Sequence, residues 1–105
     1  MRRGEIWWAE LPPPIGKRPV LLLSRDSAYR VRTSVTVAII TRTIRNIPIE
    51  VLIGRDDGMP AQCVVNLDDI LTIPMSRVTE RITALSPDKM TEVAKAIIFA
   101  LDLGD

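Results

Sequence analysis

One basic residue stands where a polar turn meets an apolar run. Arg18 follows Gly16 and Lys17 and precedes Pro19, after which the chain reads Val-Leu-Leu-Leu. Four apolar residues in a row beside a proline indicate a strand that is buried on both faces, and a proline, which has no amide hydrogen, suits its first positions. Arg18 would then be fixed at the rim of a rigid element, where its guanidinium can bind a phosphate or a carboxylate through two parallel hydrogen bonds.

The residues that are absent exclude several kinds of chemistry. The chain has no histidine, which removes the commonest acid–base group and every His-dependent triad. Cys63 is the only cysteine, so neither an internal disulfide nor a Cys/His zinc site can form. No glycine-rich phosphate loop with a following Lys-Ser/Thr occurs. The pairs Asp56-Asp57 and Asp68-Asp69 could hold magnesium, but acids in turns and between strands more often bond backbone or water. We therefore expect no metal and no cofactor.

Basic residues are concentrated in the first half of the chain. Residues 1–55 hold ten Lys/Arg against four Asp/Glu, a net charge of +6, whereas residues 56–105 hold four against nine, a net charge of −5. Eleven of the fourteen basic residues are arginines, whose forked donors match phosphate geometry. This distribution is typical of a nucleic-acid-binding surface. Solvated loop charges would give the same pattern, so the charge alone leaves both interpretations open.

Hydrophobic periodicity predicts the elements that would position these groups. Strands are expected over residues 5–11, 18–25, 34–41, 47–53, 61–66, 70–74 and 81–85. Asp26 could cap a single helical turn over residues 26–30. Apolar residues recur with helical spacing from Met90 to Leu101, after Ser86 as N-cap and Pro87 at the first helical position. We predict a mainly β fold with helix (α+β): a single domain over residues 1–105, formed by a small SH3-like antiparallel β-barrel closed by the C-terminal α-helix.

The sequence shows no sign of export or membrane insertion. Its first residues lack the apolar run and small-residue cleavage site of a signal peptide. No apolar stretch approaches the roughly 20 residues that cross a bilayer. We therefore expect a cytoplasmic protein with no membrane partner.

Five segments, taken in order, resemble the MazF/PemK (Kid) family of toxins from bacterial toxin–antitoxin systems. They are Arg3–Trp7, Lys17–Ser24, Val37–Thr41, Val64–Ile73 and Ser76–Val78. The helix after Ser86 also fits, so the resemblance covers essentially the whole chain. It implies a metal-independent endoribonuclease that cuts single-stranded RNA at short sequences. In that reaction a ribose 2′-OH attacks the adjacent phosphate and leaves a 2′,3′-cyclic phosphate and a free 5′-OH. The resemblance further implies inhibition of translation and growth, a homodimer, and neutralisation by a MazE-like antitoxin.

Carried over by position, the resemblance implies that Arg18 and Thr41 are the catalytic residues. A guanidinium and a hydroxyl suit this reaction, because the nucleophile belongs to the substrate and the protein need only align it and stabilise a more negative phosphorane. Each residue also has a structural alternative: Arg18 could bond a loop carbonyl, and Thr41 could simply end a strand. The predicted RNA-binding residues are Lys17, Arg25, Arg42, Thr43, Arg45, Asp69 and Arg77. Trp7 and Trp8 should point to opposite faces of their strand, one of them into the core.

The chain departs from the family pattern at two places. The loop Pro12–Lys17 is shorter than in many members, where it helps to gate the RNA groove and meets the antitoxin. Asp69-Ile70-Leu71 stands where Gln-Ile-Arg is usual, so a different base preference is expected if Leu71 faces the groove. Two alternatives stay open from the sequence: a non-catalytic CcdB-like toxin that poisons DNA gyrase, and a plain RNA-binding barrel. The Arg18/Thr41 pair favours the ribonuclease.

Overall fold

Residues 1–104 are described by the computed structural model, and Asp105, the last residue of the expected domain, lies outside the described residues. The strands are β1 (Glu5–Glu10), β2 (Lys17–Leu22), β3 (Ser34–Thr41), β4 (Glu50–Ile53), β5 (Cys63–Pro74) and β6 (Val78–Ala84). The helices are α1 (Ala28–Val31) and α2 (Pro87–Ala100), with the 3₁₀ turns η1 (Arg55–Asp57) and η2 (Met75–Arg77).

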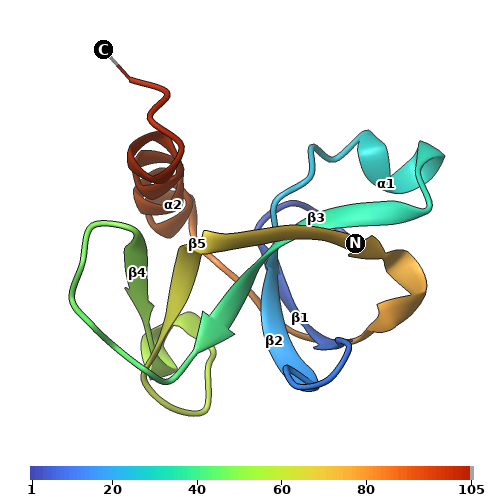
Figure 1. The fold of residues 1–105 in the computed structure, drawn as a ribbon, viewed down its shortest axis with the longest axis horizontal. Helices are drawn as coiled ribbons and strands as arrows, with labels where there is room; N and C mark the ends of the chain where they lie inside the picture. The colour runs from blue at the N-terminus through green and yellow to red at the C-terminus, as the bar shows by residue number, and fades with distance from the viewer. Residues whose placement is uncertain (105) are drawn as a thin grey trace.

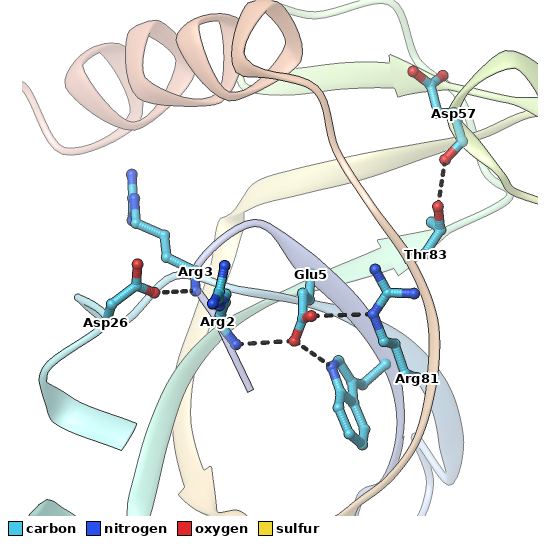
Figure 2. Close-up of polar contacts among 8 residues, drawn as sticks. Arg2, Arg3, Glu5, Asp26, Asp57, Arg81 and Thr83 are labelled. Carbon is cyan, nitrogen blue, oxygen red and sulfur yellow. Dashed lines mark hydrogen bonds and ion pairs between the residues drawn. The ribbon is translucent and has the colours of Figure 1, made fainter. Parts of the chain in front are cut away.

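The six strands form one antiparallel sheet in the order β4-β5-β3-β2-β1-β6. The strands cross at steep angles, with α2 lying beside β4 and β5 at one end of the molecule and α1 at the other (Figure 1). The predicted α+β class, an antiparallel sheet with a C-terminal helix, is confirmed. The sheet is not closed as a barrel, however, because β4 and β6 form its two edges and do not pair within the described residues. The chain leaves the sheet after Ile53 and enters η1. A hydrogen bond of 3.0 Å from Thr83 Oγ1 of β6 to the Asp57 carbonyl of η1 connects the two edges of the open sheet (Figure 2).

Strand β2 is buried on both faces, as its apolar run predicts. Val20, Leu21 and Leu22 have no exposed surface. Because side chains alternate along a strand, residues on the two faces of the sheet belong to two separate core clusters. One contains Ile6, Leu21, Ala38, Ile40 and Val65 together with Val93 and Ala96 of α2. The other contains Ala9, Val20, Leu22, Val37 and Ile39. Strand β2 pairs with β1 from Lys17 to Leu21 and with β3 from Val20 to Leu22, so its apolar half is bonded on both sides.

Two local predictions were wrong. The stretches 61–66 and 70–74 belong to one strand, β5, interrupted by a register shift: Ala38 pairs with Ile70, but the next residue, Ile39, pairs with Asn66. Asn66 Oδ1 accepts from the Asp68 N–H at 2.9 Å, so the polar residues that resemble a turn form a bulge within the strand.

Asp26 does not cap a helical turn either. Helix α1 begins at Ala28, and its N-cap residue, Ser27, makes no side-chain capping bond. Asp26 Oδ1 instead accepts from the Arg3 N–H at 2.7 Å and ties the N-terminus to this segment (Figure 2).

Helix α2 begins as the sequence predicts. Ser86 Oγ accepts from the Lys89 N–H at 3.2 Å, and Pro87 is the first helical residue. The apolar stripe is only partly covered: Val93 is fully buried, whereas Ile98 and Leu101 are 46% and 54% exposed. No helix within residues 1–104 is long and apolar enough to span a bilayer.

Candidate active site

The register between β2 and β3 brings Arg18 and Thr41 to the same place. Val20 pairs with Ile39, and Leu22 with Val37. Continued by two residues toward the end of β3, this register sets Arg18 opposite Thr41 on the same face of the sheet, because side chains alternate with a period of two. Two residues that are far apart in sequence thus lie at the same end of two buried, neighbouring strands.

Arg18 and Thr41 line one cavity of about 490 Å³. Its polar lining also includes Arg42, Thr43 and Cys63. The rest of the wall is apolar and consists of Trp8, Pro19, Ile40, Met59, Pro60, Ala61 and Ile82. The cavity therefore combines a guanidinium and hydroxyls with a large apolar surface, and no carboxylate lines it.

Both candidate catalytic side chains keep donors that are free to bind a ligand. Arg18 is half-buried as a residue, and its guanidinium makes no hydrogen bond or ion pair with any side chain of residues 1–104. Thr41 Oγ1 accepts from the Thr43 N–H at 3.2 Å, which fixes the oxygen and leaves its hydroxyl hydrogen free to donate. The pair could therefore present two kinds of donor to one phosphate.

Only some of the other predicted RNA-binding residues lie at the cavity of Arg18 and Thr41. Arg42 and Thr43 line the cavity, and Lys17 Nζ lies 5.1 Å from the ring centroid of Trp8, which also lines it. Arg25 lines a smaller cavity of about 180 Å³ at the opposite end of the β2–β3 pair. Their role as RNA contacts stays a prediction.

Three further candidates do not line the cavity of Arg18. Arg45, Asp69 and Arg77 are exposed on the turn after β3, in the β5 bulge and in η2, respectively. The Arg45 N–H donates to Glu50 Oε1 at 2.9 Å, which holds the turn after β3 in place.

Several lining residues were not singled out by the sequence. Met59 and Ile82 come from the loop after η1 and from β6, and no local pattern connects them with Arg18. Of the two tryptophans, Trp7 packs against the second core cluster and donates from Nε1 to Glu5 Oε1 at 3.1 Å. Trp8 lines the cavity. The alternation of side chains along the strand could not predict which of the two tryptophans would do so.

Cys63 is a poor candidate nucleophile although it lines the cavity. Burial raises the pKa of its thiol, and the nearby Arg42 only partly opposes this effect. The thiol is thus protonated near neutral pH and weakly nucleophilic. No three His, Cys, Asp or Glu side chains in the described part of the chain gather closely enough to hold a metal ion.

A family model described as "PemK-like, MazF-like toxin of type II toxin-antitoxin system" matches residues 2–101. The chain belongs to this toxin family. The resemblance read from the five segments is therefore confirmed.

Individual MazF proteins are similar over nearly the whole chain. A Mycobacterium tuberculosis protein named probable endoribonuclease MazF2 is 41% identical over 98 residues, which cover 92% of this chain and 94% of the relative. The structure of M. tuberculosis toxin MazF-mt6 matches with a TM-score of 0.89 and 35% identity, over 96% of this chain and 99% of that one. A mycobacterial endoribonuclease solved in complex with its cognate antitoxin matches with a TM-score of 0.89 and 27% identity, over 100% and 98% of the two chains.

Proposed function

We propose that this MazF-like chain is an endoribonuclease toxin that cuts single-stranded RNA at short sequences without a metal ion, and thereby inhibits translation and growth. Membership of the toxin family and the names of its relatives support the activity. The observation that carries the proposal is the single cavity lined by both Arg18 and Thr41.

In the proposed reaction the 2′-oxygen of one nucleotide forms a bond to the adjacent phosphorus while the bond from phosphorus to the 5′-oxygen breaks. The 2′-proton leaves, and the departing 5′-oxygen gains a proton, which gives a 2′,3′-cyclic phosphate and a 5′-OH. Arg18 stabilises the extra negative charge of the phosphorane, and the Thr41 hydroxyl donates to one of its oxygens. Arginine is effectively never deprotonated, so Arg18 is not the base. With no carboxylate in the cavity of one chain, most of the acceleration comes from alignment and charge.

The remaining partners are also proposals. The mycobacterial relative solved with its cognate antitoxin supports a MazE-like antitoxin for this chain. We further propose a single toxin domain over residues 1–105, a homodimer and a cytoplasmic location, where the substrate would be messenger RNA, with tRNA or rRNA as the alternatives.

The test is incubation of the antitoxin-free protein with single-stranded RNA in EDTA, followed by analysis of the fragment ends. We expect cleavage with cyclic-phosphate ends. Arg18→Ala should reduce the cleavage rate about 10²- to 10³-fold, as does loss of an oxyanion donor. Thr41→Val should also reduce it, and Thr41→Ser, which keeps the hydroxyl, should retain most of it.

The matched control is Lys95→Ala, which removes one positive charge from α2, outside the cavity. Its rate should equal that of the wild type. Wild-type protein that binds RNA without cutting it would support the RNA-binding alternative and refute the nuclease. Full activity in Arg18→Ala would refute the catalytic assignment alone.

A further inference from the structure

The cavity beside Arg18 and Thr41 is larger and more apolar than a phosphate requires. Its volume is about 490 Å³, and Ile40, Met59, Pro60 and Ile82 contribute to its wall. A phosphate and a ribose are polar and gain little from such a wall. A nucleobase is flat and has two apolar faces, and single-stranded RNA is commonly bound through bases that leave their stack.

Trp8 gives this wall an aromatic surface. It is half-buried, lines the cavity and pairs in register with Pro19, which also lines it. Lys17 Nζ lies over the indole, 5.1 Å from the ring centroid, in a cation–π contact. The indole is therefore held from the side of the β1–β2 loop, and a held ring loses little conformational entropy when a base stacks on it.

The charges around the cavity favour RNA over an uncharged aromatic ligand. Arg18 and Arg42 line it and Lys17 adjoins it, whereas no acidic side chain lines it. Neither arginine forms an ion pair within residues 1–104. An aromatic platform beside free cations is the usual arrangement for single-stranded nucleic acid, with bases on the ring and phosphates on the cations.

We propose that this cavity is a nucleobase subsite in which Trp8 stacks on a base next to the scissile phosphate. Trp8 acts here as a positioning residue: by holding the base it places the adjoining phosphate against Arg18 and Thr41. The proposal rests on the proposed ribonuclease function, because it assumes that the phosphate beside these two residues belongs to RNA.

The test uses a short RNA of the mapped cleavage sequence with 2′-O-methyl groups, which binds but cannot be cut. In the variant Trp7→Phe, Trp8 is the only tryptophan, and its fluorescence should be quenched as this RNA binds. In Trp8→Phe, Trp7 is the only tryptophan, and quenching should be absent although the RNA still binds. The two variants are matched because they exchange the same residue type at neighbouring positions of β1.

Affinity provides a second measurement. Trp8→Ala should weaken binding of the 2′-O-methyl RNA roughly 5- to 150-fold, which is the range for loss of one base–aromatic stack, and Trp8→Phe should restore most of it. An abasic nucleotide on one side of the scissile phosphate should weaken binding to the wild type by a similar factor. The same abasic RNA should bind Trp8→Ala no more weakly than the unmodified RNA does, because the two changes remove one interaction.

Each outcome distinguishes the two proposals. Two results would refute the base subsite and leave the nuclease intact. One is that the affinity losses of Trp8→Ala and of the abasic nucleotide multiply when the two changes are combined. The other is that the RNA binds without quenching the fluorescence of Trp8. If the wild type neither binds nor cuts single-stranded RNA, both proposals are wrong.

Discussion

The arginines of this chain are not equivalent, although composition treats them alike. Arg3 donates from Nη1 to the Leu23 carbonyl, and Arg81 Nε forms a 3.0 Å ion pair with Glu5. These two side chains support the fold. Arg18 has no such partner among the described residues and lines the large cavity. An unpaired guanidinium held on a buried strand is the one that can bind an incoming anion at little cost of reorganisation.

Glu5 links the N-terminal segment to β1 and β6, and its ionisation should be visible in the stability of the protein. Burial acts to raise the pKa of this carboxyl, but donors from Trp7, Arg81 and the Arg2 N–H bond the carboxylate and hold its pKa below the ordinary value of 4.5 (Figure 2). Because the folded-state pKa is lowered, the ionised group stabilises the fold above pH 4.5, and this contribution is lost as the pH falls through the folded-state pKa.

We therefore predict that the free energy of unfolding falls as the pH drops below 4.5 and passes through the folded-state pKa of Glu5, and that Glu5→Gln makes this fall less steep. Urea unfolding at a series of pH values measures it. The control for the loss of one carboxylate is Glu92→Gln, at a side chain on α2 that is 55% exposed. Identical slopes for wild type and Glu5→Gln would show that the Glu5 bonds do not favour the ionised form.

At the scale of elements, the turn after β4 contacts β6 and so connects the two edges of the open sheet. Gly58 follows η1 with a φ of +91°, and a Cβ at this position would lie 2.3 Å from Thr83 Oγ1. The close approach is what allows Thr83 to bond the Asp57 carbonyl across the gap between the two edge strands. Only glycine satisfies both the backbone conformation and the contact.

We predict that Gly58→Ala destabilises the protein by more than the roughly 1–2 kcal/mol expected for a left-handed backbone alone. Gly16→Ala is the matched control, because Gly16 has a φ of +70° but no atom within 4 Å of the added Cβ. Urea-unfolding midpoints of both variants, compared with the wild type, give the difference. Equal losses would mean that the Thr83 contact relaxes without cost and does not help to join the edges.

For the whole molecule, the asymmetric charge should determine how RNA binding responds to salt. The first half of the chain carries +6 and the second half −5, and Arg18 and Arg42 of the basic half meet at the cavity. Each phosphate that binds a cation releases counterions, so the logarithm of affinity falls with the logarithm of salt concentration by about 0.7 per contact for single strands.

We predict that Arg42→Gln lowers this slope by about 0.7, whereas Lys95→Gln on α2 leaves it unchanged. Fluorescence anisotropy of a labelled 2′-O-methyl RNA between about 50 and 200 mM salt measures both variants. A slope that does not change in Arg42→Gln would show that the Arg42 guanidinium binds no phosphate.

Features encoded over a few neighbouring residues were predictable from the sequence. The Val-Leu-Leu-Leu run after Pro19 predicts a strand buried on both faces, and Ser86-Pro87 predicts the start of α2, because periodicity and capping depend on local chemistry. The family segments further indicated Arg18 and Thr41, whose roles are still predictions.

Features that depend on contacts between distant segments were decided by the tertiary structure alone. The bulge in β5 depends on its pairing with β3, and the open edges depend on where η1 turns the chain out of the sheet. The choice of Trp8 rather than Trp7 for the cavity depends on which face of β1 packs against the second core cluster. The cavity itself is lined by residues of β1, β2, β3, β5 and β6 and of the loops after β3 and η1. No short window of sequence contains that information, because the register between strands is set by burial of the whole sheet.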